Sequence, residues 1–268
     1  MKPGKYDDIS LAEYHKMPEW SKTMLDLINK SPAHYMEWKA NPPEPTDSMK
    51  MGLALHCAVL TPALYDKEYV VKPECDRRTK EGKKIYADFI EECGDRTSIS
   101  AIDAGKVAVM TEKIYNHSLA SQLLSNGEAE QSFFWTNPKT GIECKARPDY
   151  LRHDNVCIEL KVTHSLIGNA FQRTSYNFRY HVQGAFFIDG IFHAVERSCN
   201  EFVIIAIEDE PPHGIKVFVM DDLAIDTGVI EYQENLATVK QWQEHPELFK
   251  SVYIESEKPI ELSLPLWA

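Results

Sequence analysis

The most constraining feature of this sequence is a period-two alternation of apolar and polar residues near its centre. Two segments, residues 142–151 and 156–163, show the alternation, and a turn-forming segment at 152–155 separates them. Because successive side chains of a β-strand point to opposite faces, each segment can bury one face and present the other. In the second segment the apolar set is Val156, Ile158, Leu160 and Val162, and the other set is Cys157, Glu159, Lys161 and Thr163. The sequence therefore predicts a central antiparallel hairpin with one polar face.

Helical and extended patterns alternate along the rest of the chain. Apolar residues at helical spacing predict helices that begin after Ser21, pass through 35–38, and cover 51–60, 102–124, 180–191 and 222–244. Further strands are predicted at 131–135, 201–207 and 215–220. The expected fold class is α/β (α+β), with a central mixed β-sheet that carries the hairpin and is flanked by helices.

We expect one domain over residues 1–268. It would comprise an N-terminal helical segment at 1–45, a core at 46–250 and a C-terminal tail at 251–268. The proline cluster at 41–45 is the best candidate for a linker, but the pattern after it does not mark a domain boundary. The tail is apolar from Ser256 onward, so we expect it to pack on the core or against a neighbouring subunit.

The chain is acidic, with a net charge of −12, and 43% of its residues are hydrophobic. Acidity argues against sequence-specific binding of duplex nucleic acid, because phosphate contacts are made by Lys and Arg. It argues less against a nuclease, which needs a positive lining only where the strand passes. In the charged loop and helix predicted at 76–96, a solvated face is the favoured interpretation, and the candidates for phosphate contact are Arg77, Arg78, Lys80, Lys83 and Lys84.

Several other classes of protein lack support in the sequence. No stretch approaches the roughly 18 apolar residues of a membrane span, and residues 1–8 lack the apolar core of a signal peptide, so we expect a cytoplasmic location without a membrane partner. The six cysteines show no C-x-x-C spacing, which predicts free thiols. The motifs of a P-loop, a dinucleotide fold, a serine hydrolase and a zinc protease are missing as well.

The polar face of the hairpin carries the candidate chemistry. If the turn is centred near Asp154, then Asp149 and Glu159 lie opposite each other, with Cβ atoms about 5 Å apart. Two carboxylates at that distance repel unless a cation compensates, and Lys161 or a divalent metal could do so. Mg²⁺ and Mn²⁺ accept such oxygen ligands and activate water for attack on phosphate. Glu130, just before the first strand, could reach the same cluster directly or through a water.

Pro148-Asp149 followed by Glu159-Leu160-Lys161 resembles the PD-(D/E)xK nuclease superfamily, which implies a restriction-endonuclease-like core. The segment from Gly52 to His56 resembles the G-x-x-x-H helix of RecB-type nucleases. Gln183 resembles the start of their Q-x-x-x-Y motif, but Phe187 stands where that motif has Tyr. The resemblance implies that the metal ligands are His56, Asp149, Glu159 and the backbone carbonyl of Leu160. It also implies that the catalytic group is Lys161, assisted by Glu130 as an acidic partner and Gln183 as a phosphate-binding or hairpin-positioning residue.

Within the superfamily, the chain most resembles the C-terminal nuclease domains of the exonuclease VIII (RecE-type) family. This resemblance implies a Mg²⁺-dependent exodeoxyribonuclease, with Mn²⁺ as a substitute, that degrades linear double-stranded DNA from 5′ to 3′. The 3′ single-stranded tails would serve recombination by strand annealing, and a single-strand annealing protein of RecT type would be the partner. A homotetrameric ring threaded by DNA is also implied.

Other interpretations of the same residues stay open. Asp149, Glu159 and Lys161 could form an ordinary cross-strand salt-bridge ladder, His56 a satisfied core histidine, and Gln183 a hydrogen bond between helix and sheet. Within the superfamily, an endonuclease or a single-strand exonuclease would share the hairpin. A non-catalytic DNA-binding or protein interaction module on the same fold is the alternative from a different class.

Overall fold

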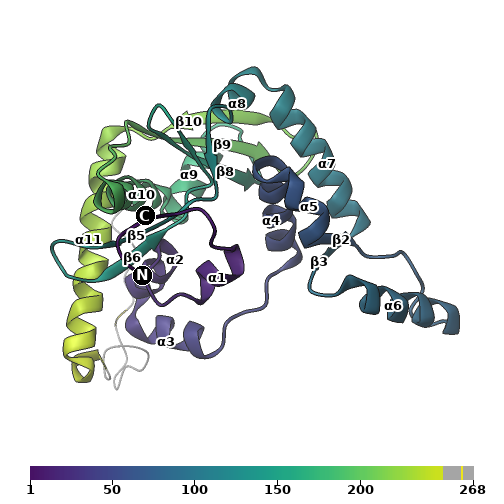
Figure 1. Cartoon of the computed structure of the whole chain (residues 1–268), viewed down its shortest axis with the longest axis horizontal. Helices are drawn as coiled ribbons and strands as arrows, with labels where there is room; N and C mark the ends of the chain where they lie inside the picture. The colour runs from purple at the N-terminus through teal and green to yellow at the C-terminus, as the bar shows by residue number, and fades with distance from the viewer. Residues whose placement is uncertain (250–260, 262–268) are drawn as a thin grey trace.

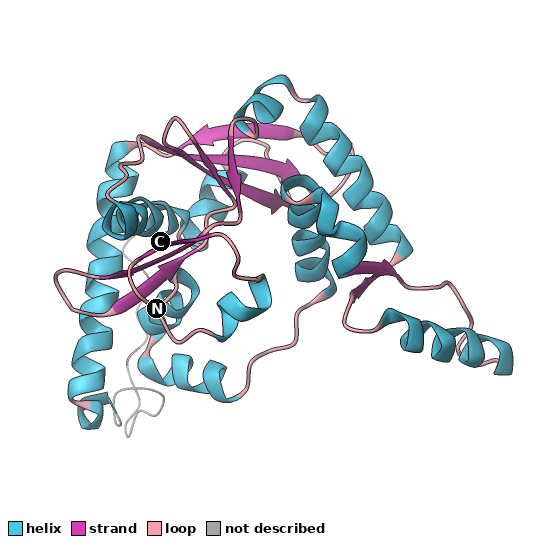
Figure 2. Cartoon of the chain, in the orientation of Figure 1, coloured by secondary structure: helices cyan, strands magenta, loops and turns pink. Residues whose placement is uncertain are grey.

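A five-stranded mixed sheet organises the fold in the computed structural model, which describes residues 1–249 and 261 (Figures 1 and 2). Its strand order is β10-β9-β8-β7-β4, and only the β8–β9 pair is parallel. The strands are β4 (Gly127–Ala129), β7 (Tyr150–Arg152), β8 (Val156–Thr163), β9 (Glu201–Glu208) and β10 (Ile215–Val219). The predicted fold class, a mixed sheet with a hairpin flanked by helices, is confirmed.

Both faces of this sheet are covered, which explains why β9 is apolar along almost its whole length. Phe202, Ile204 and Ala206 face a core cluster built with α10 (Tyr180–Val195), α11 (Asp222–Glu244) and α2 (Lys22–Lys30). Val203 and Ile205 face a second cluster built with α4 (Asp47–Leu60) and α7 (Ala101–Asn116). The sheet therefore holds the candidate site between two helical layers.

The predicted strand at 142–151 is wrong as a single element, because it splits between two sheets. Its first part is β6 (Glu143–Ala146), in a three-stranded sheet of order β1-β5-β6 with β1 (Gly4–Tyr6) and β5 (Ser132–Thr136). Its second part is β7 of the large sheet. Pro148 stands at the break, and a proline has no N–H for a sheet ladder. The split also corrects the polar face. The alternation predicts Lys145 on the same face as Asp149, but Lys145 is 1% exposed and its Nζ donates to the backbone carbonyls of Tyr14 and Met17.

The predicted helix at 102–124 is also two elements, α7 and α8 (Ser118–Leu123). His117 separates them, and its Nδ1 accepts a hydrogen bond from the backbone N–H of Ala120, so it caps the second helix. Several short elements are not predicted by the sequence patterns because they span too few residues to show a period. Apart from β1 and β4, they are α1 (Leu11–Lys16), α5 (Pro62–Glu68), β2 (Tyr69–Val71), β3 (Thr97–Ile99), α9 (Ala170–Asn177) and the 3-10 turn Pro246–Phe249.

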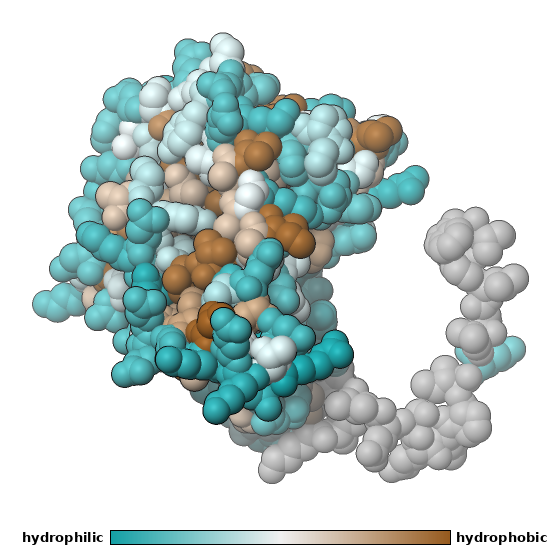
Figure 3. Space-filling model, turned by 90° about the vertical axis from the view of Figure 1, so that its right-hand side faces the viewer, coloured by the Kyte–Doolittle hydropathy of each residue, from teal (hydrophilic) through white to brown (hydrophobic). Residues whose placement is uncertain are grey.

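The charged segment at 76–96 forms an arm that projects from the body. Its helix, α6 (Lys80–Cys93), follows β2 and precedes β3, and these two strands pair in parallel. Figure 1 shows α6 well away from the large sheet, and Figure 3 shows the face on that side, where hydrophobic residues gather in a middle band between hydrophilic regions. The five candidate cations of this segment, Arg77 to Lys84, are all exposed, as a solvated face requires. Their contact with phosphate stays a prediction.

The helix α3 (Pro32–Ala40) and the helices α2, α4, α10 and α11 agree with the sequence patterns. None of the helices within residues 1–249 combines the length and the hydrophobicity needed to span a bilayer. All six cysteines are free thiols. The predicted packing of the tail at 251–268 lies outside the described residues, apart from position 261.

Close packing of α11 on α10 requires a glycine at position 228. A Cβ there would lie 2.3 Å from the backbone oxygen of His181 and 2.9 Å from the Cβ of Ala185, so the helices would have to separate. We expect Gly228→Ala to lower the free energy of unfolding by about 1–3 kcal/mol, although alanine favours helix. Denaturant unfolding measures this change. Gly52→Ala in α4 is the matched control, because no atom lies within 4 Å of the added carbon, and equal stabilities of the two variants would refute the argument.

Candidate active site

The hairpin of β7 and β8 brings the two predicted carboxylates together. Tyr150 pairs with Ile158, and continuing this register places Asp149 opposite Glu159, as the sequence predicts. The backbone N–H of Asp149 donates to Glu159 Oε1 at 3.1 Å. The backbone N–H of Leu160 donates to Asp149 Oδ2 at 2.7 Å. Asp149 and Glu159 are buried, at 8% and 2% exposed, and each of these bonds gives one carboxylate a backbone donor that holds it in place.

The same register explains why a proline stands at position 148. It places Pro148 opposite Leu160, and in an antiparallel ladder the N–H and C=O of one residue point toward the same neighbouring strand. The N–H of Leu160 bonds to the Asp149 side chain, while the proline has no N–H to offer the Leu160 carbonyl. The Leu160 carbonyl oxygen therefore points to the same side as Asp149 and receives no backbone hydrogen bond from Pro148. A backbone oxygen without such a bond is available as a metal ligand.

Lys161 follows on the polar side of β8. Its Nζ lies 2.6 Å from Glu159 Oε2 and 5.2 Å from the centre of the Tyr180 ring. Burial and the nearby Asp149 raise the pKa of Glu159 to about 7, even though Lys161 opposes this shift. Burial would lower the pKa of Lys161, but the two carboxylates outweigh it and hold that pKa above its usual value. The ammonium group therefore stays charged beside the carboxylates.

His56 and Glu130 approach Asp149 from two other elements. His56, on α4, places Nδ1 3.2 Å from Asp149 Oδ1. Burial opposes a charge on His56, but Asp149 raises its pKa above the ordinary value. Glu130 precedes β5 in the left-handed conformation, with φ of 56°, and its N–H donates to the Asp149 carbonyl at 3.0 Å. Its carboxylate pairs with Arg147 at 2.8 Å.

These residues fit a divalent cation. One ligand atom each from His56, Glu130 and Asp149 lies within 4.8 Å of the others. Two carboxylate oxygens and one imidazole nitrogen suit Mn²⁺, and the oxygens suit Mg²⁺. Of the four predicted metal ligands, His56 and Asp149 belong to this cluster, and the Leu160 carbonyl faces the same side. Glu159 lies outside this cluster and contacts Lys161, so its role as a ligand stays a prediction, and the cluster contains Glu130 as its second carboxylate.

Gln183 reaches the hairpin from α10. Its Nε2 donates to Glu159 Oε2 at 2.7 Å, so Glu159 is held between the amide and the Lys161 ammonium. This contact matches the hairpin-positioning role more directly than phosphate binding. One turn further along α10, Phe187 is 6% exposed and packs in the core in place of the motif tyrosine.

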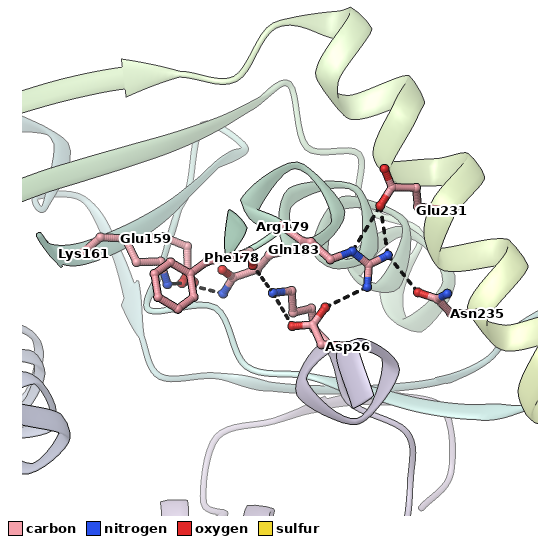
Figure 4. Close-up of polar contacts among 9 residues, drawn as sticks. Asp26, Glu159, Lys161, Phe178, Arg179, Gln183, Glu231 and Asn235 are labelled. Atoms are coloured by element: carbon pink, nitrogen blue, oxygen red, sulfur yellow. Dashed lines mark hydrogen bonds and ion pairs between the residues drawn. The ribbon is translucent and has the colours of Figure 1, made fainter. Parts of the chain in front are cut away.

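Residues outside the motifs support this arrangement (Figure 4). Arg179, the residue before α10, adopts the left-handed conformation with φ of 54°. Its guanidinium contacts Asp26 on α2 at 2.9 Å, and Glu231 and Asn235 on α11 at 3.0 and 2.9 Å. These bonds fix the start of the helix that carries Tyr180 and Gln183. No sequence motif marks Arg179. Arg147 does have a local signal, because it stands two residues before Asp149 in the alternating segment.

The chain is similar in fold to a solved structure and matches the model of one protein family. A crystal structure named "Putative exonuclease" from Eubacterium rectale superposes with a TM-score of 0.65 over 96% of this chain and 97% of its own, at 12% identity, and so shares the fold. A second structure, SSO0001, gives a TM-score of only 0.31 at 11% identity, over 88% of this chain and 89% of its own. No curated protein matches the sequence significantly. The model of the PDDEXK-like domain of unknown function (DUF3799) matches residues 21–252, so the chain belongs to this PDDEXK-like family.

Proposed function

We propose that this protein is a divalent-metal-dependent deoxyribonuclease. The observation that carries the proposal is the convergence of Asp149, Glu159 and Lys161 on one hairpin, with His56 and Glu130 against Asp149. A salt-bridge ladder on a solvent face would leave these groups exposed. Here Asp149 and Glu159 are buried, and a histidine and a second carboxylate surround Asp149.

The residues divide the chemistry between them. His56, Asp149, Glu130 and the Leu160 carbonyl would hold the ion, with Glu159 beside Asp149 as a further predicted ligand. Mg²⁺ is the expected metal and Mn²⁺ a substitute. When bound, the ion lowers the pKa of water and stabilises charge on the scissile phosphate. Lys161 orients the attacking water and offsets charge that develops on the phosphate. Glu159 fixes the position of Lys161, and Gln183 fixes Glu159.

The finer proposal is an exonuclease that degrades linear double-stranded DNA from 5′ to 3′ and leaves 3′ single-stranded tails for recombination. Two similarities support it, the resemblance of the motifs to the exonuclease VIII family and the name of the Eubacterium rectale structure. On the same basis we propose a ring-shaped homotetramer and a single-strand annealing partner of RecT type.

Digestion of end-labelled linear duplexes tests this function. One substrate carries a label on its 5′ ends and the other on its 3′ ends, and Mg²⁺ starts the reaction. The proposal predicts early release of the 5′ label as short products, while the 3′ label stays on long single strands. Release of the 3′ label first would contradict the polarity, and absence of cleavage with Mg²⁺ and Mn²⁺ would contradict the nuclease itself.

Gln183→Ala is expected to slow DNA hydrolysis without unfolding the protein. The substitution removes the amide that holds Glu159 Oε2, so the carboxylate and Lys161 lose one constraint on their positions. Misplacement of a supporting group costs about 10- to 100-fold in rate. Turnover on linear duplex measures the effect, and Gln241→Ala on the exposed surface of α11 is the control. An unchanged rate in Gln183→Ala would assign Gln183 to packing alone.

A further inference from the structure

The corner between α9 and α10 exposes aromatic rings beside the candidate site. Phe178 is 61% exposed and Tyr176 is 73% exposed. A single exposed aromatic residue is ordinary in a folded protein. Phe178 is different because it stacks on Tyr180, which lies beside the catalytic lysine, and the chemistry described above gives Phe178 no role.

A continuous stack leads from Phe178 into the site. The rings of Phe178 and Tyr180 are nearly parallel, at 16°, with centres 6.0 Å apart. The ammonium of Lys161 lies 5.2 Å from the centre of the Tyr180 ring. Taken together, these two distances put the exposed ring at most about 11 Å from the catalytic lysine, slightly more than three base steps of about 3.4 Å each.

The backbone of Phe178 is fixed although its ring is exposed. Its N–H donates to the Thr174 carbonyl at 3.0 Å, and its carbonyl accepts a hydrogen bond from Lys22 Nζ at 2.6 Å. The next residue, Arg179, is tied to α2 and α11. Because the backbone under the exposed ring is already fixed, less conformational entropy is lost when a ligand stacks on the ring.

The neighbouring surface suits a nucleic acid strand. An open depression of about 620 Å³ lies on α9, the helix that precedes Phe178. Its lining contains amides, one cation, the Tyr176 ring and no carboxylate: Asn169, Gln172, Arg173, Tyr176 and Asn177. Arg173 is the cation of this lining, whereas Lys22 and Lys161 are paired with the carboxylates of Asp26 and Glu159. Aromatic rings combined with cations are typical of surfaces that bind single-stranded nucleic acid.

We propose that Phe178 is a stacking platform for one unpaired nucleobase of the DNA strand that enters the site. The proposal rests on the nuclease function and specifies its substrate: a strand that is single, or frayed at its end, where it meets the protein. A base inside an intact duplex has both faces covered by its neighbours and cannot stack on the ring, whereas an unpaired base at a strand end can.

Binding of oligonucleotides that carry one abasic nucleotide tests the platform. The abasic position is moved one nucleotide at a time from the end, and affinity is measured by fluorescence anisotropy with Ca²⁺ in place of Mg²⁺ at fixed salt. For the wild type we expect one position, or two adjacent ones, at which loss of the base weakens binding about tenfold, as loss of one stacked base should. In Phe178→Ala this position-specific loss should disappear, whereas Phe178→Trp should keep it. Phe192→Ala, which removes another exposed phenylalanine, should behave as the wild type.

The outcomes separate the platform from the nuclease function. A protein that hydrolyses DNA but shows equal losses at every abasic position, or the same pattern in Phe178→Ala, would overturn the platform alone. A change of oligomeric state in Phe178→Ala, measured by sedimentation, would assign the ring to an interface between copies and overturn it too. Absence of both DNA binding and hydrolysis in the wild type would overturn the function together with the platform.

Discussion

Lys161→Met is expected to slow DNA hydrolysis by about 10³-fold, because it removes a positioned cation from the reacting phosphate and water. Methionine keeps an unbranched apolar side chain beside Tyr180, whose ring centre lies 5.2 Å from the lysine ammonium in the wild type. Its thioether cannot pair with Glu159, whose buried carboxylate then lacks the ammonium that lies at 2.6 Å in the wild type. The pKa of Glu159, which is about 7 with the lysine present, should rise further. Single-turnover hydrolysis of linear duplex with saturating Mg²⁺ measures the loss.

A second lysine variant controls for the loss of charge. Lys106→Met removes a cation from α7, and the partner of this cation is the exposed Glu210, which is not one of the site residues. It should digest DNA at the rate of the wild type. If Lys161→Met also digests at that rate, then Lys161 is only the cation of a buried pair, and another residue must assist the attack.

Asp149→Asn is expected to abolish stabilisation by divalent metal and to slow hydrolysis by a comparable factor. Asp149 stands at the centre of the cluster, in contact with His56 and opposite Glu159. A ligand that binds only the folded state stabilises it by about 2.7 kcal/mol at one hundred times its dissociation constant. The melting temperature of the wild type should therefore rise with Mg²⁺ or Mn²⁺. That of Asp149→Asn should stay constant over the same concentrations.

The control for this experiment lies on the same hairpin. Asp154, in the turn, is exposed and pairs with Arg152 at 2.7 Å. Asp154→Asn changes the net charge by the same amount and should keep the full metal-dependent shift. An equal shift in Asp149→Asn would mean that the ions bind elsewhere on this acidic chain, and the cluster would lose its assignment.

The hairpin could be predicted from the sequence because its determinants are local. A strand alternates its side chains with a period of two, and a short turn at 152–155 fixes the register, so the placement of Asp149 opposite Glu159 follows from counting residues. The helix α4 could likewise be predicted from its apolar residues. The contact between His56 and Asp149 is implied only by the motif resemblance, because the apolar pattern of α4 does not show which side of the helix meets the hairpin.

Other features depend on contacts between distant segments, and the sequence patterns missed them. The segment at 142–151 alternates regularly, and this alternation does not show that its two parts join different sheets. Only Pro148 marks the break. Because this proline has no N–H, it also offers no backbone hydrogen bond to the Leu160 carbonyl. The contacts of Arg179 with α2 and α11 join residues separated by more than fifty positions. No periodicity within one segment can predict such contacts.

Digestion of linear and closed-circular duplex DNA by the wild type, Lys161→Ala and Asp149→Ala is the most direct test of the proposed site. With Mg²⁺, the wild type should consume the linear DNA and leave the closed circles intact, and both variants should leave both substrates intact. Cleavage of closed circles by the wild type would assign an endonuclease. If the wild type cuts neither DNA with Mg²⁺ or Mn²⁺, or if the two variants cut as fast as the wild type, the account of this site as a metal-dependent nuclease is contradicted.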